Sequence, residues 1–130
     1  MTNVANAEYA DAANLRASLR QFLRRSEEVS RKHGLTPQQY LLLLMIKASE
    51  ETSEPATISQ LVERLALTQS TVTELVQRAE DAGLVGRRPS PDDGRVVYLS
   101  LTALGSKRLH AAFVELGPER ASLLQTIHGD

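Results

Sequence analysis

Residues 57–105 read TISQLVERLALTQSTVTELVQRAEDAGLVGRRPSPDDGRVVYLSLTALG. Thr57 and Thr68 each precede a helical pattern of apolar residues, and threonine in that place is a typical helix N-cap. The apolar residues of the second helix recur at i, i+3, i+4 and i+7, which predicts one buried stripe. They are Val72, Leu75, Val76 and Ala79. Gly83 ends this helix, because glycine tolerates a left-handed backbone. The short connection at 65–67 predicts a helix-turn-helix.

The residues after Gly83 change from a helical to a strand pattern. The runs 84–88 and 96–101 are short and rich in β-type residues. Between them lies PSPDDG, residues 89–94, in which nearly every residue favours a turn. A β-hairpin placed directly after a helix-turn-helix is the arrangement of a winged helix. Thr102 then caps a further helix.

Helical patterns flank this central stretch on both sides. An amphipathic helix is expected from Tyr9 to Arg31, ending near Gly34. Residues 36–39 read TPQQ. Thr36 is a typical N-cap, Pro37 is favoured at the first helical position, and Gln39 lies three residues after the cap, so a second helix is expected to start there. Residues 49–55 are expected to form an acidic loop. The helix after Thr102 is expected to reach residue 116, where Gly-Pro interrupts it, and a final turn or two follows.

These elements predict a mainly α (α+β) protein of one domain, residues 1–130. The winged helix-turn-helix would occupy residues 36–102, and residues 1–34 and 103–130 would supply flanking helices that mediate dimerisation. Apolar residues make up 42% and charged residues 24% of the chain, ordinary values for a globular protein. A length of 130 residues suits one such domain.

Composition also excludes several kinds of function. No cysteine occurs, which removes disulfides, thiolate metal sites and cysteine-based redox sensing. The longest apolar run, Leu41–Ile46, is far shorter than the roughly 20 residues that cross a bilayer. The first residues lack the pattern of a signal peptide. We therefore expect a soluble cytoplasmic protein without a membrane partner.

No enzyme or metal chemistry is expected. His33, His110 and His128 lie far apart in the sequence and lack partners at the spacing of metal ligands. The chain has neither a nucleophile elbow nor a glycine-rich phosphate loop. The sequence therefore predicts neither catalysis nor a cofactor.

The outward face of the helix at 68–82 carries the candidate DNA contacts. Its first half holds short hydroxyl and amide side chains, which allow close approach to the major groove and can bond to bases or phosphates. The net charge of −1 confines any DNA contact to a local surface. From this helix alone, a solvated face is an equally good interpretation. Glu74 favours it, because a carboxylate repels phosphate unless it accepts a bond from a cytosine amino group. The candidate contacts are Gln69, Ser70, Thr71, Thr73, Gln77 and Arg78.

The hairpin favours DNA binding over a merely solvated surface. Arg95 lies at its tip, where a guanidinium can enter the narrow minor groove beside the recognition helix. Asp93 is two residues earlier and is expected to hold that guanidinium in one orientation. Arg87 and Arg88 on the incoming strand are expected to contact backbone phosphates.

Taken together, these residues resemble the MarR family of winged-helix transcriptional regulators. The resemblance covers nearly the whole chain, and its most specific part is RRPSPDDGRVVYLSLTALG, residues 87–105. There Asp93 and Arg95 match the family's wing Asp-x-Arg, and Leu101, Thr102 and Gly105 match the Leu-Thr-x-x-Gly that follows. The resemblance implies a homodimer, held by its first and last helices, that binds a pseudo-palindromic double-stranded operator. It also implies a repressor that a small ligand releases from DNA.

The chain departs from the family pattern in three places. Glu74 stands where members frequently carry arginine, and Gly94 stands where a second wing arginine is common. Binding is therefore expected to neutralise fewer phosphates per subunit. The chain also ends thirteen residues after Gly117, which predicts a short closing helix and leaves the extent of the dimer interface open.

Two further interpretations remain open at this point. The resemblance implies an effector pocket between the dimerisation helices and the winged helix, which Arg16, His33 and Tyr40 could line. Core or surface placement is the better interpretation of each residue taken singly, so none is assigned as a ligand residue. A winged helix can also serve as a protein-protein adaptor without binding DNA. The dependence of affinity on salt would separate the two functions, because only phosphate contacts release counterions.

Overall fold

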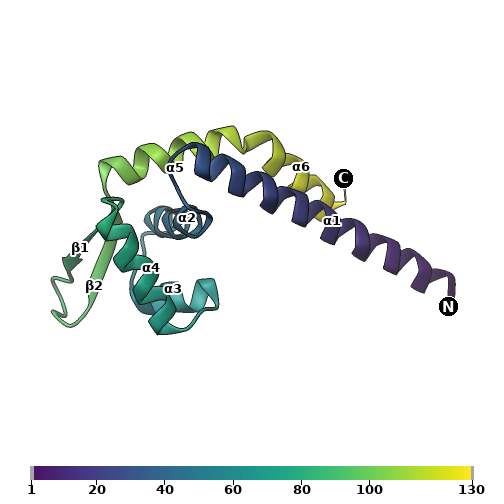
Figure 1. Ribbon diagram of the computed structural model, residues 1–130. Helices are drawn as coiled ribbons and strands as arrows, with labels where there is room; N and C mark the ends of the chain where they lie inside the picture. Colours follow the sequence, from purple (N-terminus) through teal and green to yellow (C-terminus); the bar gives the residue numbers. More distant parts are fainter. Residues whose placement is uncertain (1, 130) are drawn as a thin grey trace.

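The computed structural model describes residues 2–129, and the side chains of residues 7–129. Figure 1 shows the arrangement of its helices and its hairpin, and the element order predicted from the sequence is confirmed. The described chain contains α1 (Thr2–Lys32), α2 (Pro37–Glu51), α3 (Ile58–Leu65), α4 (Gln69–Asp81), β1 (Val85–Pro89), β2 (Val97–Leu101), α5 (Ala103–Glu115) and α6 (Gly117–His128). In Figure 1, α1, α5 and α6 form a long upper layer, and α2 to β2 lie below one end of it.

Four threonines fix where helices begin. Thr36, Thr57, Thr68 and Thr102 each have extended backbone angles, and each hydroxyl accepts a hydrogen bond from the backbone N–H three residues later. At Thr36 the bond is reciprocal, because the side chain of Gln39 accepts from the Thr36 N–H. The helix starts predicted from these signals are confirmed.

The two strands form an antiparallel hairpin that projects from the end of α4 (Figure 1). Val85 pairs with Leu101 and Pro89 with Val97. The backbone N–H of Leu99 also donates to the carbonyl of Ala56, 2.9 Å away, and this bridge ties the segment before α3 to the hairpin. The strands begin one residue later than predicted, and the first extends through Pro89.

One core lies between α2, α4, α5 and the hairpin, and α2 passes through its centre. Leu42, Leu43 and Ile46 on α2 are fully buried or nearly so. The predicted stripe of α4 is confirmed in part, because Val72, Val76 and Ala79 are buried whereas Leu75 is half-buried. The other buried apolar residues are Val29, Leu35, Tyr40, Ala56, Leu61, Leu84, Val85, Leu99, Leu109, Ala112 and Leu116.

Three predicted boundaries are wrong. The first helix begins well before Tyr9, at Thr2, and α2 continues through Glu51 instead of giving way to a loop at Ser49. Ser49 is buried within α2, where its hydroxyl donates to the carbonyl of Met45 one turn earlier and lies 3.1 Å from Oε1 of Gln60. The last helix, α6, has 12 residues and not a turn or two. Pro118 lies in the first turn of α6. A backbone N–H in that turn has no partner within the helix, so the N–H that proline lacks costs no hydrogen bond, and Gly-Pro begins α6 instead of ending it.

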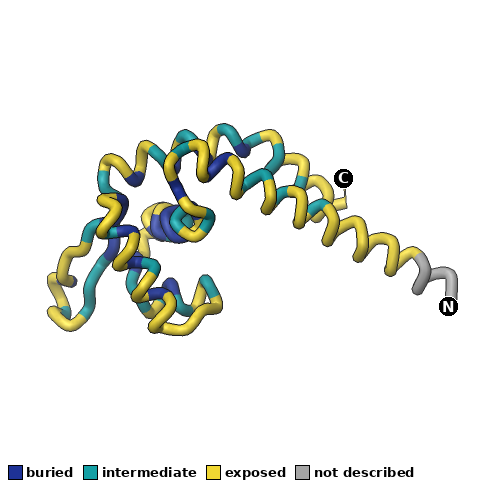
Figure 2. Tube along the Cα trace, in the orientation of Figure 1, coloured by how far each residue is buried: buried dark blue, intermediate teal, exposed yellow. Residues whose placement is uncertain are grey.

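The arm formed by α1 and α6 has almost no interior. No residue of α6 is buried, and no residue of α1 is buried from 7 to 28 (Figure 2). Leu15, Leu19 and Leu23 on α1 and Leu124 and Ile127 on α6 are all exposed, by 43% to 54%. An amphipathic helix gains most of its stability by burying its apolar side, and within this single chain the apolar residues of the arm gain little of it.

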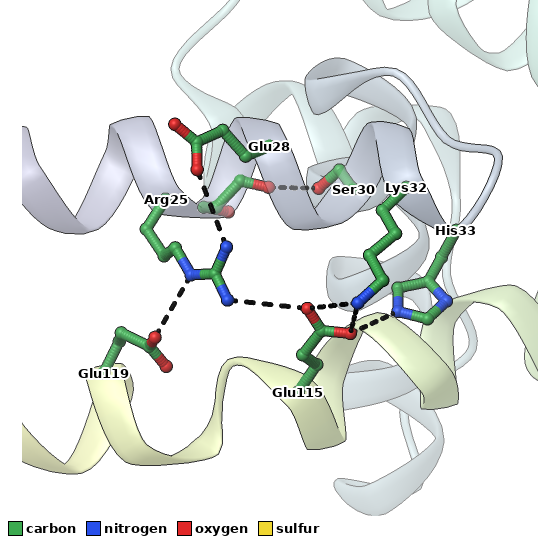
Figure 3. Close-up of polar contacts among 8 residues, drawn as sticks. Arg25, Glu28, Ser30, Lys32, His33, Glu115 and Glu119 are labelled. Carbon is green, nitrogen blue, oxygen red and sulfur yellow. Dashed lines mark hydrogen bonds and ion pairs between the residues drawn. The ribbon is translucent and has the colours of Figure 1, made fainter.

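An ion-pair cluster joins the arm to the rest of the protein (Figure 3). Arg25 on α1 lies within 3.6 Å of carboxylate oxygens of Glu28, Glu115 and Glu119. Nε2 of His33 donates to Glu115, 2.9 Å away, and Nζ of Lys32 lies 3.0 Å from the same carboxylate. The bond from His33, and next that from Lys32, lowers the pKa of Glu115, while the bond to Glu119 raises the pKa of Arg25. The cluster thus fixes α1 against the junction of α5 and α6.

Candidate nucleic-acid interface

The outer surface of α4 is open to solvent along its whole length. Because one side of the helix packs into the core through Val72, Val76 and Ala79, the opposite side faces away from the protein. All six residues predicted on this helix to contact DNA are exposed: Gln69, Ser70, Thr71, Thr73, Gln77 and Arg78. We call these six residues, together with Glu74 and Asp81, the α4 face.

The start of α4 carries a group of hydroxyls. The Thr68 hydroxyl donates to Oγ1 of Thr71, 2.9 Å away, and accepts from the Thr71 backbone N–H. Oγ of Ser70 lies 3.5 Å from the same Thr68 hydroxyl. The cap thereby arranges short polar side chains around the positive end of the helix dipole, an arrangement that suits a phosphate or a base edge.

Carboxylates hold the longer donors at the other end of α4. Nη2 of Arg78 donates to Glu74, and Nε2 of Gln77 donates to Asp81 at 3.1 Å. Across the end of the helix, Nε of Arg87 on β1 donates to Glu80. Sequence reasoning missed Glu80, because its contact joins a helix to a strand seven residues later and leaves no periodic signal.

The wing, residues 89–96, has an ordered tip built around Ser90. This side chain is buried, and its oxygen accepts from the backbone N–H groups of Asp92 and Asp93 at 3.2 and 3.3 Å. Its hydroxyl donates to the phenol oxygen of Tyr98, 3.2 Å away. Sequence reasoning treated Ser90 only as part of a turn, although a serine at the start of Ser-Pro-Asp-Asp, residues 90–93, is a recognisable signal for such a local bond.

The predicted contact between Asp93 and Arg95 is present at the tip. One carboxylate oxygen of Asp93 accepts from the Arg95 backbone N–H at 3.0 Å and from its Nε at 3.3 Å. The Arg95 side chain is nevertheless 93% exposed, so its outer nitrogens point away from the protein. Arg88 is exposed on β1 with its guanidinium 5.4 Å from the centre of the Tyr98 ring.

Thr102 and Gly105 set the position of this surface relative to α5. The Thr102 hydroxyl donates to the carbonyl of Gly83 at 2.6 Å, and its backbone N–H donates to the carbonyl of Leu84 at 3.0 Å. A Cβ on Gly105 would lie 2.1 Å from that Leu84 oxygen. Only glycine therefore lets α5 pack this closely against the junction of α4 and β1, which is a physical reason for the Leu-Thr-x-x-Gly pattern.

A pocket of about 460 Å³ lies between α2, β2 and α5. The three residues considered for an effector pocket do not line it. Tyr40 is buried in the core, His33 binds Glu115, and Arg16 lies on the exposed part of α1. The mainly apolar lining consists of Leu44, Lys47, Ala48, Glu51, Leu101, Ser106, Leu109, His110 and Phe113.

Comparison with known proteins agrees with this geometry. A family model described as MarR family matches residues 33–96. The organic hydroperoxide resistance transcriptional regulator of Bacillus subtilis (strain 168) is 34% identical over 92 residues, which cover 71% of this chain and 60% of that protein. This chain thus spans less than two thirds of the length of that relative.

Two solved structures share the fold. A MarR family transcription regulator superimposes with a TM-score of 0.75 and 25% identity, over 100% of this chain and 82% of that one. A mutant of MarR from E. coli complexed with operator DNA gives a TM-score of 0.69 at 22% identity, over 92% of this chain and 81% of that one.

Proposed function

This chain belongs to the MarR family, and from that premise we propose that it is a homodimeric regulator of transcription that binds double-stranded DNA sequence-specifically. The observation that carries the proposal is the exposed surface formed by the α4 face and the wing. Short polar side chains at the start of α4 suit the major groove, and Arg95 at the wing tip suits the minor groove. Arg87 and Arg88 would contact phosphates between them.

The exposed arm supports dimerisation. Leu15, Leu19 and Leu23 lie on one side of α1, and α6 presents Leu124 and Ile127. A second copy of the chain would cover these residues and stabilise α6, which buries none of its own. A two-fold pair would present two α4 faces, so the operator would be pseudo-palindromic with half-sites about 34 Å apart or a multiple of that distance.

We further propose that the protein acts as a repressor released by a small ligand, and that it works by binding and not by catalysis. The apolar pocket between α2 and α5 supports the first point, because α5, which lines it, connects the winged helix to α6 of the arm. The name of the Bacillus subtilis relative, a transcriptional regulator, supports the second.

Within the described residues no helix is long and apolar enough to cross a membrane.

Titration of labelled duplex DNA at several salt concentrations tests this function. With four phosphate contacts per dimer, from Arg87 and Arg88 of each subunit, the logarithm of the association constant should fall with that of the salt concentration with a slope of about −4. Arg88→Gln should make the slope shallower by about 2, because a dimer loses two contacts. A chain that binds no duplex at any salt concentration would instead be a protein-binding adaptor.

A further inference from the structure

Glu74 and Arg78 form an ion pair in the middle of the α4 face. The residues are one helical turn apart, and their side chains are 62% and 70% exposed. Exposed pairs at this spacing contribute little to helix stability. A carboxylate here also repels the phosphates that the surrounding residues would approach. Stability and phosphate binding therefore leave the presence of Glu74 unexplained.

The pair presents donors and an acceptor side by side. Arg78 supplies several N–H donors in a planar group, and the carboxylate of Glu74 supplies acceptors directly beside them. Among the described residues neither side chain has another ion-pair partner, whereas Gln77 is bonded to Asp81. The remaining bonding capacity of both charged groups is therefore available to a ligand.

The major-groove edge of a G·C base pair has the matching pattern. Guanine presents two acceptors, N7 and O6, and the cytosine beside it presents the N4 amino donor. Two donors from Arg78 followed by an acceptor from Glu74 satisfy all three positions. An A·T pair does not fit, because the arginine would meet the N6 amino group of adenine and the carboxylate would meet the O4 acceptor of thymine.

The neighbouring side chains allow the required approach. Ser70, Thr71 and Thr73 are short, so the first turns of α4 can lie close to the bases. Glu74 and Arg78 follow on the same exposed surface and are longer, so they can reach base edges from a helix seated at that depth.

We propose that Glu74 is a specificity-determining residue, which accepts a hydrogen bond from the N4 amino group of a cytosine while Arg78 binds the paired guanine. Each half-site then contains one G·C pair recognised by these two side chains. The inference rests on the proposed function, since it requires α4 to enter the major groove. It assigns Glu74 a role in choosing sequence, at a cost in overall affinity for DNA.

Selection of bound duplexes from a random library at fixed salt tests this assignment, with the full chain, Glu74→Gln and Glu63→Gln compared. Glu63 is an exposed carboxylate on α3, so its substitution removes the same charge away from α4. The full chain should select a two-fold symmetric consensus with one G·C pair per half-site favoured about 5- to 150-fold at that position. Glu74→Gln should weaken this preference and keep the others, because an amide can face either cytosine or thymine while Arg78 still binds guanine. Glu63→Gln should keep all of them.

Two other outcomes separate the proposals. If Glu74→Gln binds every duplex more tightly by the same factor and keeps each base preference, Glu74 is only a repulsive charge, and this inference is wrong while the proposed function stands. If the full chain selects no symmetric consensus, the proposed function fails, and the role of Glu74 fails with it.

Discussion

The close approach of α5 to the backbone of Leu84 gives Gly105→Ala a large expected effect on stability. The added Cβ would lie 2.1 Å from the carbonyl oxygen of Leu84 and 3.0 Å from its carbonyl carbon. That oxygen also accepts the hydrogen bond from the Thr102 backbone N–H, so moving it away would break a helix-start contact. Overpacking typically costs about 1–3 kcal/mol, and backbone cannot rotate away as a side chain can, so we expect about 3 kcal/mol.

For a domain of this size, that loss corresponds to a fall in Tm of roughly 12 °C. Urea unfolding followed by far-UV circular dichroism measures the loss in the free energy of unfolding. All variants are compared at one protein concentration, because the stability of a dimer depends on concentration. Gly94→Ala is the matched control, since a Cβ there meets nothing within 4 Å, and it should stay within about 0.5 kcal/mol of the unchanged chain. Equal stability of the two variants would refute the argument that α5 packs rigidly on Leu84.

Two further predictions concern the wing and the ion-pair cluster. Arg95→Ala should weaken operator binding in a gel-shift titration by about 1–3 kcal/mol, and Asp93→Ala should lose part of the same energy, because the carboxylate positions the guanidinium. A double variant that loses the full sum would show that Asp93 does not act through Arg95. The pKa of Glu115 is lowered in the folded state by its bonds from His33 and Lys32, so the unfolded state binds more protons in acid. The stabilisation is fully present above about pH 4.5 and is lost as the pH falls through the lowered pKa. Thermal unfolding should therefore show the unchanged chain more stable than Glu115→Gln at about pH 6, with the difference shrinking as the pH falls below about 4.5. A difference independent of pH would contradict this assignment.

Local signals in the sequence were enough to predict the winged helix. Thr36, Thr57, Thr68 and Thr102 mark helix starts through bonds to residues only three positions away, and such bonds are visible in any single stretch. Gly83 has the left-handed backbone, φ +76°, that its place at a helix end predicts. The contact of Arg95 with Asp93 was also predictable, because only two residues separate them.

Features that depend on packing between distant segments were not predictable. His33 and Glu115 are 82 positions apart, and only the packing of α1 on α5 brings them together. The residues that line the pocket between α2 and α5 depend on how these two helices pack against each other. The periodicity of apolar residues in the sequence does not contain that information. The length of α6 was missed because Pro118 both ends and starts helices, and the neighbouring sequence does not distinguish the two roles.

A hydroxyl-radical footprint of the full chain on its selected duplex tests the central claim most directly. If two symmetry-related copies each place α4 in a major groove and Arg95 in the flanking minor groove, the pattern will show two equivalent protected segments, centred about 10 base pairs apart or a multiple of that spacing. Sedimentation of the same complex should give two chains per duplex. A single protected segment, or one chain per duplex, would contradict the account.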